Sequence, residues 1–488
     1  MRLPTGFFIG FALTCAALTI SSSAQTFQTL ASFNMNNGAF PERMSLVQGR
    51  DGRLYGTTEE GGIEDCQMAV GCGTIFQIAG DGELVSLYRF CSQPSCSDGD
   101  EPLAGLLLGN DGYFYGTTVA GADRGCLGGC GTIFRITGQG KLTTLHRFCP
   151  RGLCPGGSNP AAALVQGIDG NFYGTADGGA NSQGIAFKMS PSGTPTTLYN
   201  FCSQPNCADG QIPNGLAQGT DGNFYGTTAS TVFRISPSGT LKTLYTFCSQ
   251  RNCADGSDPE AGLVQGSDGD FYGTTAGGGT HGCCNGTVFK ITPEGALTTL
   301  YSFCALPDCA DGSEPLAGLI QATDGNFYGT TSWGGDPTCA GPGCGTVFKI
   351  TSAGVLTTLH KFDLTDGAEP LGGLLQATNG NFYGTTRNAG PNLNDLNHMG
   401  TVFSLSMGLG PFVAFVDGAG KVGHTGGILG QGFTGTTSVS LNGVPANFTV
   451  RSDTYITATV PAGATTGYVT VTTPSGTLTS NVPFHVLR

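Results

Sequence analysis

The chain has 488 residues, of which 82 are glycine and only 11% are charged, so it is richer in glycine and poorer in charge than ordinary globular proteins. This length exceeds one ordinary hydrophobic core and indicates several domains or an array of repeats. The formal net charge of −13 argues against nucleic-acid binding, and 19 cysteines argue against the reducing cytosol.

The N-terminus has the pattern of an export signal over residues 1–24. Arg2 gives a positive start, residues 7–20 are apolar, and Ser22-Ser23-Ala24 supplies small residues before a cleavage site at Gln25. No later segment has the ~18 uninterrupted apolar residues that a membrane-spanning helix needs. We therefore expect no transmembrane segment after signal removal, and a secreted or cell-surface location.

Residues 25–408 contain seven copies of one unit. The phrase (F/L)YGT recurs with its tyrosine at Tyr55, Tyr115, Tyr173, Tyr225, Tyr272, Tyr328 and Tyr383. Phrases close to GLVQ, GTVFKI and TLYSF also occur seven times each. A long period of this kind is the signature of a repeat architecture.

Each unit predicts four short strands, which the sixth unit illustrates. The strands are expected at residues 318–322, 326–331, 346–351 and 356–362, with a hairpin turn at Asp324-Gly325 between the first two. The alternation in Val347-Phe348-Lys349-Ile350 has the period of a strand and not of a helix.

Seven such units predict an all-β fold, a seven-bladed β-propeller of four-stranded antiparallel blades, with a β-solenoid as the alternative. The array begins with a lone fourth strand, residues 27–33, and ends after the third strand of the last unit, so the N-terminal strand is expected to close the ring. The first strands are rich in small residues, as strands lining a crowded central channel must be. A glutamine recurs in these first strands, and Leu108 is the exception. Its side chain either forms part of a polar ring in the channel or hydrogen-bonds to neighbouring backbone groups. The positions are Gln48, Gln166, Gln218, Gln265, Gln321 and Gln376.

The phrases GLIQATDGNFYGTTSWGG and GTVFKITSAGVLTTLHKF resemble the GloVer tandem repeats of secreted bacterial proteins. The resemblance covers roughly residues 26–408. It implies an exported, often surface-associated repeat protein and transfers no catalytic residue.

The cysteines after Cys15 fall into local pairs, and a loop that lacks one member of a pair lacks both. This pattern predicts disulfides, with the adjacent pair Cys283 and Cys284 left open because a bond between neighbours is strained. Zinc is the alternative, but it needs two pairs to converge, and equivalent loops of neighbouring blades lie roughly 10 Å or more apart. The pairs are Cys66/Cys72, Cys91/Cys96, Cys126/Cys130, Cys149/Cys154, Cys202/Cys207, Cys248/Cys253, Cys283/Cys284, Cys304/Cys309 and Cys339/Cys344.

All nine pairs lie in loops of one face of the expected propeller, which we take as the candidate functional face. Trp333, the single tryptophan, either stacks on a sugar ring or packs against its own loop. His281 lies in another loop of this face without metal-ligand spacing. Asp311 and Glu314 belong to a repeated Asp-Gly-x-x-Pro phrase, which either binds calcium or forms a turn that leads into the next strand.

Residues 409–488 lack the repeat phrases and predict a small β-sandwich. ILGQGFTGTTSVSLNGVPANFTV, ITATVPAGATTGYVTVTTPSG and SNVPFHV resemble the IPT/TIG family of immunoglobulin-like domains, although Asp417-Gly418 replaces the proline-centred turn often seen at the start. The resemblance implies a spacer or protein-contact module.

The sequence contains no HExxH, GxSxG or Walker A phrase, and no cofactor is expected, with calcium as the alternative. The leading hypothesis is a non-enzymatic surface protein that binds a glycan or another extracellular protein. The alternatives are a polysaccharide-active hydrolase or lyase that uses loop carboxylates, and a purely structural module of an envelope or matrix.

Overall fold

The computed structural model describes residues 25–62, 71–122, 129–149, 154–282, 285–339, 341–390 and 399–487. Within these ranges the regular structure is almost entirely β-strand, as predicted. The helices in this part of the chain are four 3-10 turns at Pro94–Cys96, Pro205–Cys207, Arg251–Cys253 and Pro307–Cys309. The predicted export signal, residues 1–24, lies outside the described residues.

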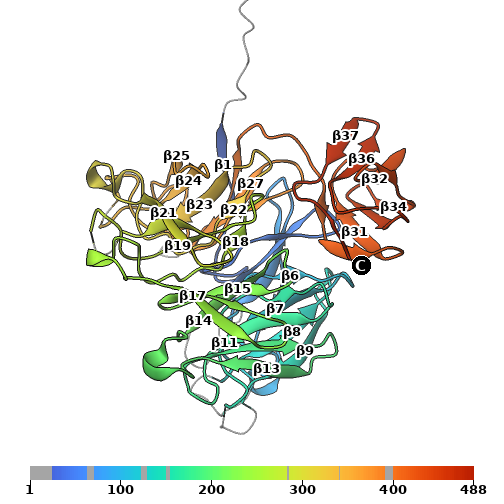
Figure 1. Ribbon diagram of the computed structural model, residues 1–488. Helices are drawn as coiled ribbons and strands as arrows, with labels where there is room; N and C mark the ends of the chain where they lie inside the picture. Colours follow the sequence, from blue (N-terminus) through green and yellow to red (C-terminus); the bar gives the residue numbers. More distant parts are fainter. Residues whose placement is uncertain are drawn as a thin grey trace, which may run out of the picture.

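The repeats form four-stranded antiparallel sheets, seven of them among the described residues, each ordered as its strands follow in a unit (Figure 1). The first strands are β2 (Val47–Gln48), β6 (Leu107–Leu108), β10 (Val165–Gln166), β14 (Pro213–Gln218), β18 (Val264–Gln265), β22 (Ile320–Gln321) and β26 (Leu375–Gln376). The second are β3 (Leu54–Thr58), β7 (Phe114–Thr118), β11 (Phe172–Ala176), β15 (Phe224–Thr228), β19 (Phe271–Thr275), β23 (Phe327–Thr331) and β27 (Phe382–Thr386). The third are β4 (Thr74–Ile78), β8 (Thr132–Ile136), β12 (Ile185–Met189), β16 (Thr231–Ile235), β20 (Thr287–Ile291), β24 (Thr346–Ile350) and β28 (Thr401–Ser406). The fourth are β5 (Leu84–Arg89), β9 (Leu142–Arg147), β13 (Pro195–Asn200), β17 (Leu241–Thr246), β21 (Leu297–Ser302) and β25 (Leu356–Lys361).

The seventh sheet takes its fourth strand from the other end of the array. Strand β1 (Thr26–Ser32) pairs antiparallel with β28, and the sheet has the order β1-β28-β27-β26. The first and seventh sheets are also in contact, because the backbone N–H of Thr378 donates to Gln48 Oε1 at 3.0 Å. The N-terminal strand therefore supplies the strand that the last unit lacks, as predicted.

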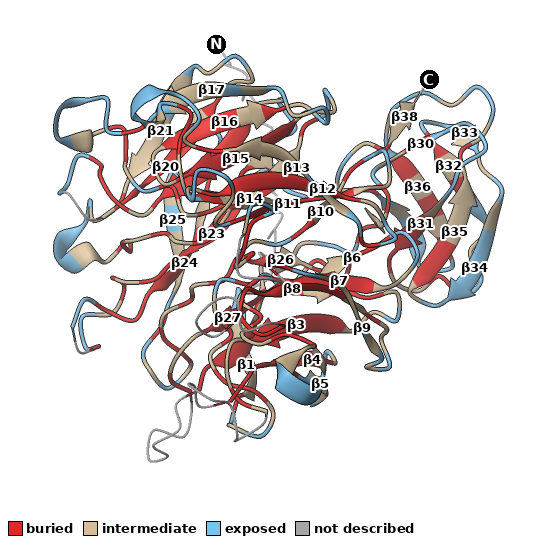
Figure 2. Cartoon of the chain, turned by 90° about the horizontal axis from the view of Figure 1, so that it is seen from below, coloured by how far each residue is buried: buried red, intermediate tan, exposed pale blue. Residues whose placement is uncertain are grey.

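The middle strands of each sheet form the core, which Figure 2 shows in red. The YGT phrase explains how the sheets are joined. In the sixth unit the Tyr328 hydroxyl donates to Asp324 Oδ2 at 2.8 Å, and its ring stacks on Phe382 of the next sheet with centroids 4.2 Å apart. A Cβ on Gly329 would lie 2.7 Å from the Phe348 ring, so this position excludes larger residues.

The repeated glutamines connect neighbouring sheets through the backbone. Gln321 Oε1 accepts from the N–H of Ser267 at 2.8 Å, and its Nε2 donates to the carbonyl of Gly325 at 3.0 Å. Five further glutamines accept in the same way from the backbone of the adjacent sheet; they are Gln48, Gln166, Gln218, Gln265 and Gln376. Backbone satisfaction, and not a polar channel ring, is therefore the role of these amides.

The C-terminal segment is a separate compact body beside the repeats, coloured red in Figure 1. Two four-stranded sheets enclose a core that includes Phe433, Ile456 and Val471, and a two-stranded parallel sheet completes the segment. The first sheet has the order β29 (Ala414–Phe415), β31 (Thr425–Leu429), β35 (Tyr455–Thr459), β34 (Phe448–Ser452). The second is β33 (Val444–Pro445), β32 (Ser438–Leu441), β36 (Val469–Thr473), β37 (Gly476–Thr479), and the parallel pair is β30 (Ala419–Lys421) and β38 (His485–Leu487).

The C-terminal segment docks where the glutamine pattern is broken. Thr454 Oγ1 donates to the carbonyl of Arg50 at 2.7 Å, and the Arg50 guanidinium lies 4.7 Å from the centroid of the Tyr455 ring. Leu108, the exception among the glutamines, belongs to one apolar cluster with Tyr455 and Leu429. Leu108 is therefore apolar because the C-terminal segment covers it.

Candidate functional site on the loop face

Two kinds of loop meet on one face of the repeats. The loops that lead into each first strand pair with the loops that follow each second strand, through isolated bridges such as Asp100↔Ala120, Ser257↔Gly277 and Ser313↔Trp333. We call this side the loop face. The loops that lead into the first strands are the described residues within 33–46, 90–106, 148–164, 201–212, 247–263, 303–319 and 362–374. The loops that follow the second strands are the described residues within 59–73, 119–131, 177–184, 229–230, 276–286, 332–345 and 387–400. The opposite side, with the short hairpin turns, is the turn face. Arg50 lies on the turn face, so the contacts just described place the C-terminal segment there.

Disulfides hold the loop face together. The predicted bonds Cys91–Cys96, Cys149–Cys154, Cys202–Cys207, Cys248–Cys253, Cys304–Cys309 and Cys339–Cys344 are all present. Cys72 and Cys130 are also disulfide-bonded.

Four cysteines of the predicted pairs lie outside the described residues. Cys66 and Cys126 are the predicted partners of Cys72 and Cys130. Cys283 and Cys284 form the adjacent pair, and neither residue is described. The bonds that involve Cys66 and Cys126, and the bond between Cys283 and Cys284, therefore stay predictions.

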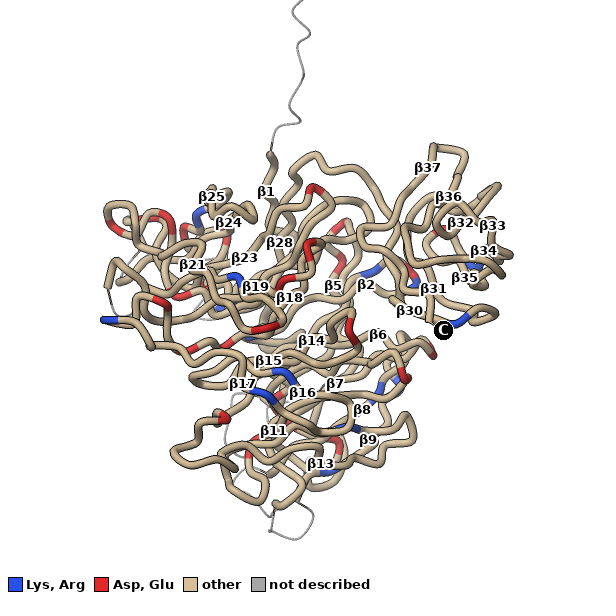
Figure 3. Tube along the Cα trace, in the orientation of Figure 1, with Lys and Arg blue, Asp and Glu red and all other residues tan. Residues whose placement is uncertain are grey.

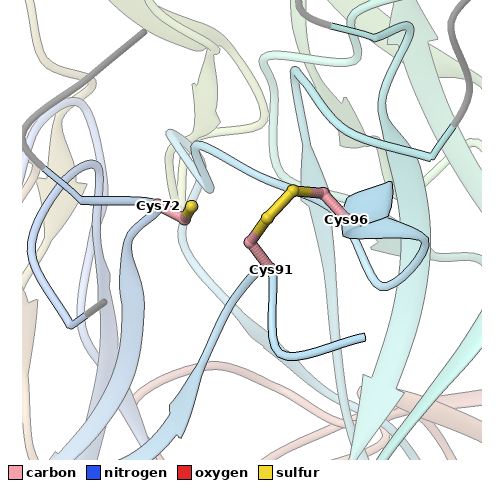
Figure 4. A group of neighbouring side chains, drawn as sticks. All are labelled: Cys72, Cys91 and Cys96. Atoms are coloured by element: carbon pink, nitrogen blue, oxygen red, sulfur yellow. A yellow bond between two sulfur atoms is a disulfide. The ribbon is translucent and has the colours of Figure 1, made fainter. Parts of the chain in front are cut away.

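The two kinds of cysteine loop converge within one repeat, which the sequence analysis did not anticipate. Cys72 lies with Cys91 and Cys96 in a group whose sulfur atoms are all within 4.8 Å of one another (Figure 4). Cys130 forms the same arrangement with Cys149 and Cys154. The separation of equivalent loops was the wrong distance to consider, because different loops meet here: the N–H of Glu101 donates to the carbonyl of Cys72 at 3.2 Å. Their disulfide bonds, and not their spacing, argue against zinc.

Removing one local disulfide is expected to destabilise its loop moderately. A Cys248→Ala/Cys253→Ala double variant should lose about 2 kcal/mol of unfolding free energy, since the closed loop is short. Chemical denaturation of the variant and the parent measures this loss. An unchanged midpoint would show that the bond contributes nothing to stability.

The repeated loop aspartates are parts of buried turns. Asp311 is 1% exposed and accepts from the Tyr301 hydroxyl at 2.8 Å and from the backbone N–H groups of Ala305 and Leu306 at 3.0 and 3.1 Å. Asp98, Asp209 and Asp255 repeat this arrangement. The Asp311 carboxylate thus accepts three hydrogen bonds within its own loop.

Trp333 and Glu314 lie together in the sixth unit. Trp333 is half-buried, and its backbone forms the bridge to Ser313 with N···O distances of 2.9 and 3.1 Å. Burial raises the pKa of the Glu314 carboxyl, and a hydrogen bond from the Trp333 side chain opposes this shift. His281, in the preceding unit, is exposed, and its Nδ1 lies 3.2 Å from the carbonyl of Ser302. The structure thus pairs Trp333 with Glu314 and shows no contact of either with His281.

An acidic cluster on the same face was not singled out by the sequence. It comprises Glu42, Glu59, Glu60 and Glu101, and Arg387 of the seventh unit forms an ion pair with Glu42. Burial raises the pKa of Glu59 to about 8. The negative charge of Glu42 and a hydrogen bond between the two carboxyl groups add to this rise. Burial also raises the pKa values of Glu60 and Glu101. Glu59 therefore holds its proton at neutral pH while it is hydrogen-bonded to Glu42, as the acid of a carboxylate pair would.

A second charged pair lies between the acidic cluster and Trp333. Arg43, the neighbour of Glu42, forms an ion pair with Glu260 at 2.9 Å, and Glu260 raises the pKa of Glu314 by repulsion. Arg43 and Glu260 also line a central cavity of about 300 Å³ whose wall is built largely from alanine, glycine and leucine. The Arg43–Glu260 ion pair thus places two charged groups at this cavity. Figure 3 shows acidic positions in red across the repeat sheets.

The family comparison covers most of the chain. The model of the Gloeobacter/Verrucomicrobia repeat matches residues 14–231 and 228–447. The chain belongs to this family. No curated protein matches the sequence. Among the described residues no helix is long and apolar enough to cross a membrane.

Solved structures of low identity resemble this family member. The extracellular domain of a putative one-component system from B. thetaiotaomicron has a TM-score of 0.46 and 10% identity, over 94% of this chain and 59% of that one. The chain therefore spans less than two thirds of that domain. A putative oxidoreductase (glucose dehydrogenase) from Thermus thermophilus has a TM-score of 0.37 and 16% identity, over 67% and 99% of the two chains. A gluconolactonase from Xanthomonas campestris has a TM-score of 0.37 and 14% identity, over 80% and 93%.

Proposed function

We propose that this repeat protein is an exported, non-enzymatic binding protein whose loop face contacts an extracellular glycan. In this proposal the seven sheets form a closed seven-bladed β-propeller, and the C-terminal segment is an immunoglobulin-like module of the IPT/TIG type. The observation that carries the proposal is the set of disulfides confined to the loop face. Disulfides persist in oxidising compartments, and rigid loops on a stable scaffold are the usual carriers of binding sites.

The position of the C-terminal segment supports the choice of face. Its contacts with Arg50 lie on the turn face, so the loop face keeps its opening, the acidic cluster and Trp333. Carboxylates accept hydrogen bonds from sugar hydroxyl groups, and an indole ring packs on the apolar C–H surface of a sugar. A protein partner on the same face is the alternative that the binding screen distinguishes.

Trp333→Ala is expected to weaken binding of a glycan identified on an array by roughly 1–3 kcal/mol, as for other aromatic anchors. The loop should remain folded, because Cys339 and Cys344 close it separately. Titration calorimetry of parent and variant gives the change in affinity. Val355→Ala, a 64% exposed position in a turn of the opposite face, is the matched control and should bind like the parent. Equal affinity of Trp333→Ala and the parent for every ligand found would contradict the role of the indole.

The Glu42–Glu59 pair supports a second candidate function, a polysaccharide hydrolase or lyase. A carboxyl group that holds its proton near neutral pH is suited to general acid catalysis. Incubation with a polysaccharide panel, read by mass spectrometry for products, separates the two candidates. Products that disappear in Glu59→Gln would establish the enzyme; binding without products would establish the binding protein. If neither binding nor product release is observed, the purely structural module remains.

A further inference from the structure

Two groups of three cysteines on the loop face bring sulfur atoms of different disulfides together. Within each group, which we call a triad, no two sulfur atoms are more than 4.8 Å apart. Two of the three cysteines are bonded to each other, and the third is bonded to a cysteine outside the triad. The first triad, drawn in Figure 4, is Cys72, Cys91 and Cys96, and the second is Cys130, Cys149 and Cys154.

Backbone hydrogen bonds hold the two loops of a triad together. In the second triad the N–H of Phe148, the neighbour of Cys149, donates to the carbonyl of Gly131, the neighbour of Cys130, at 3.0 Å. The equivalent residues of the first triad form the same bond, also at 3.0 Å. Because these bonds do not depend on the disulfides, the sulfur atoms of a triad stay close to one another when one disulfide opens.

The three cysteines of the second triad differ in exposure. Cys130 and Cys149 are buried, with 0% and 5% of their surface exposed, whereas Cys154 is only half-buried. A small thiol from the solvent therefore reaches Cys154 more easily than the other two. In thiol–disulfide exchange a thiolate attacks one sulfur of the bond, and the other sulfur leaves as a thiolate. Attack at Cys154 thus generates a Cys149 thiolate beside Cys130.

We propose that the triads are thiol–disulfide exchange sites, at which a small thiol replaces disulfides within single loops by a disulfide between two loops. In the second triad the small thiol forms a mixed disulfide with Cys154, and the Cys149 thiolate then attacks the sulfur of Cys130. A Cys130–Cys149 bond forms, and the former partner of Cys130 leaves as a thiolate and takes up the proton that the small thiol gave up. One thiol enters, one thiol leaves and two disulfides remain, so the step needs no oxidant.

The loop face also contains disulfides that lack a third cysteine and serve as internal controls. Cys344 precedes the Gly-Thr of its third strand as Cys130 does, but the loop after β25 has no cysteine. Cys202–Cys207 and Cys248–Cys253 follow fourth strands as the bonded pairs of the triads do, but the other loop of their units has no cysteine. These three bonds should not exchange with a neighbour.

The test treats the folded mature chain with reduced glutathione at millimolar concentration and about pH 8, near the ordinary pKa of a thiol. Acid and N-ethylmaleimide stop the exchange, and mass spectrometry of a digest made without reduction identifies the linked peptides. Peptides that join Cys130 to Cys149, and Cys72 to Cys91 or Cys96, should form. They should exceed new links at the three control bonds by about tenfold or more, since adjacent groups react at a high effective concentration.

Cys154→Ser supplies the attacking thiol without glutathione, because it removes the partner of Cys149 beside Cys130. The isolated variant should contain a Cys130–Cys149 bond, and its free thiol should lie on the former partner of Cys130, predicted to be Cys126. Maleimide labelling followed by peptide mapping locates this thiol.

Cys207→Ser is the matched control, because it removes the partner of Cys202 in a loop that has no third cysteine nearby. Cys202 should remain a free thiol in this variant. The proposal is overturned if Cys149 remains a free thiol in Cys154→Ser. It is also overturned if glutathione produces no more new links in the triads of the parent than at the control bonds, a comparison that does not depend on the folding of any variant.

Discussion

Deletion of residues 25–32 is expected to cause the largest loss of stability of any short truncation of this protein. Strand β1 is the outer strand of the seventh sheet, and Phe27 packs against Phe403 and stacks on His360 with centroids 5.3 and 3.6 Å apart. Its removal exposes the backbone edge of β28 and the core beneath it. The loss of unfolding free energy should reach at least the ~3–5 kcal/mol of a buried Phe→Ala change. Chemical denaturation measures this loss.

Two further measurements show whether the strand acts through its place in the sheet. A peptide of residues 25–34 added to the truncated protein should restore part of the lost stability, because the edge of β28 is open to pairing. Hydrogen exchange should show the largest loss of protection in β28 and β27, and little change in the sheet of β14 to β17. An unchanged denaturation midpoint after the deletion would refute the role of β1 in joining the ends of the array.

The repeat sheets could be predicted from the sequence because their signals are local. Asp324-Gly325 sets a hairpin, and the alternation from Val347 to Ile350 sets a strand, before any distant contact is known. The predicted first strand, 318–322, is longer than the observed β22, Ile320–Gln321. Gly318 instead packs closely on the neighbouring repeat, where a Cβ would lie 3.2 Å from the carbonyl oxygen of Gly262.

The candidate sites could not be predicted in the same way, because distant segments build them. Glu42, Glu59 and Arg387 come from the two ends of the array and meet only when the first and seventh sheets pack together. Leu108 was a visible exception among the glutamines, but its reason appears only with Tyr455 of the C-terminal segment beside it. A break in a repeat pattern thus indicated an interface without indicating its partner.

The stability of the protein is expected to fall as the pH rises through neutrality, because of Glu59 in the acidic cluster and Asp100 beside it. The pKa of Glu59 is raised from 4.5 to about 8, and burial raises that of Asp100, the neighbour of Glu101, from 3.8 to about 7. Between the lower and the higher value the unfolded chain has released these protons while the folded chain still holds them. The contribution of these two groups to stability is therefore full below about pH 4 and is lost progressively up to about pH 8, where both states are ionised.

Glu59→Gln is expected to remove much of this pH dependence, since a neutral amide imitates the protonated carboxyl and cannot ionise. The thermal midpoint of the variant should exceed that of the parent at about pH 9 and approach it at about pH 5. Scanning calorimetry over this range makes the comparison. Glu294→Gln, an exposed residue in a turn of the opposite face, is the matched control and should follow the parent at every pH. If Glu59→Gln and the parent lose stability equally with rising pH, the raised pKa of Glu59 is refuted, and the case for a catalytic acid on the loop face is lost with it.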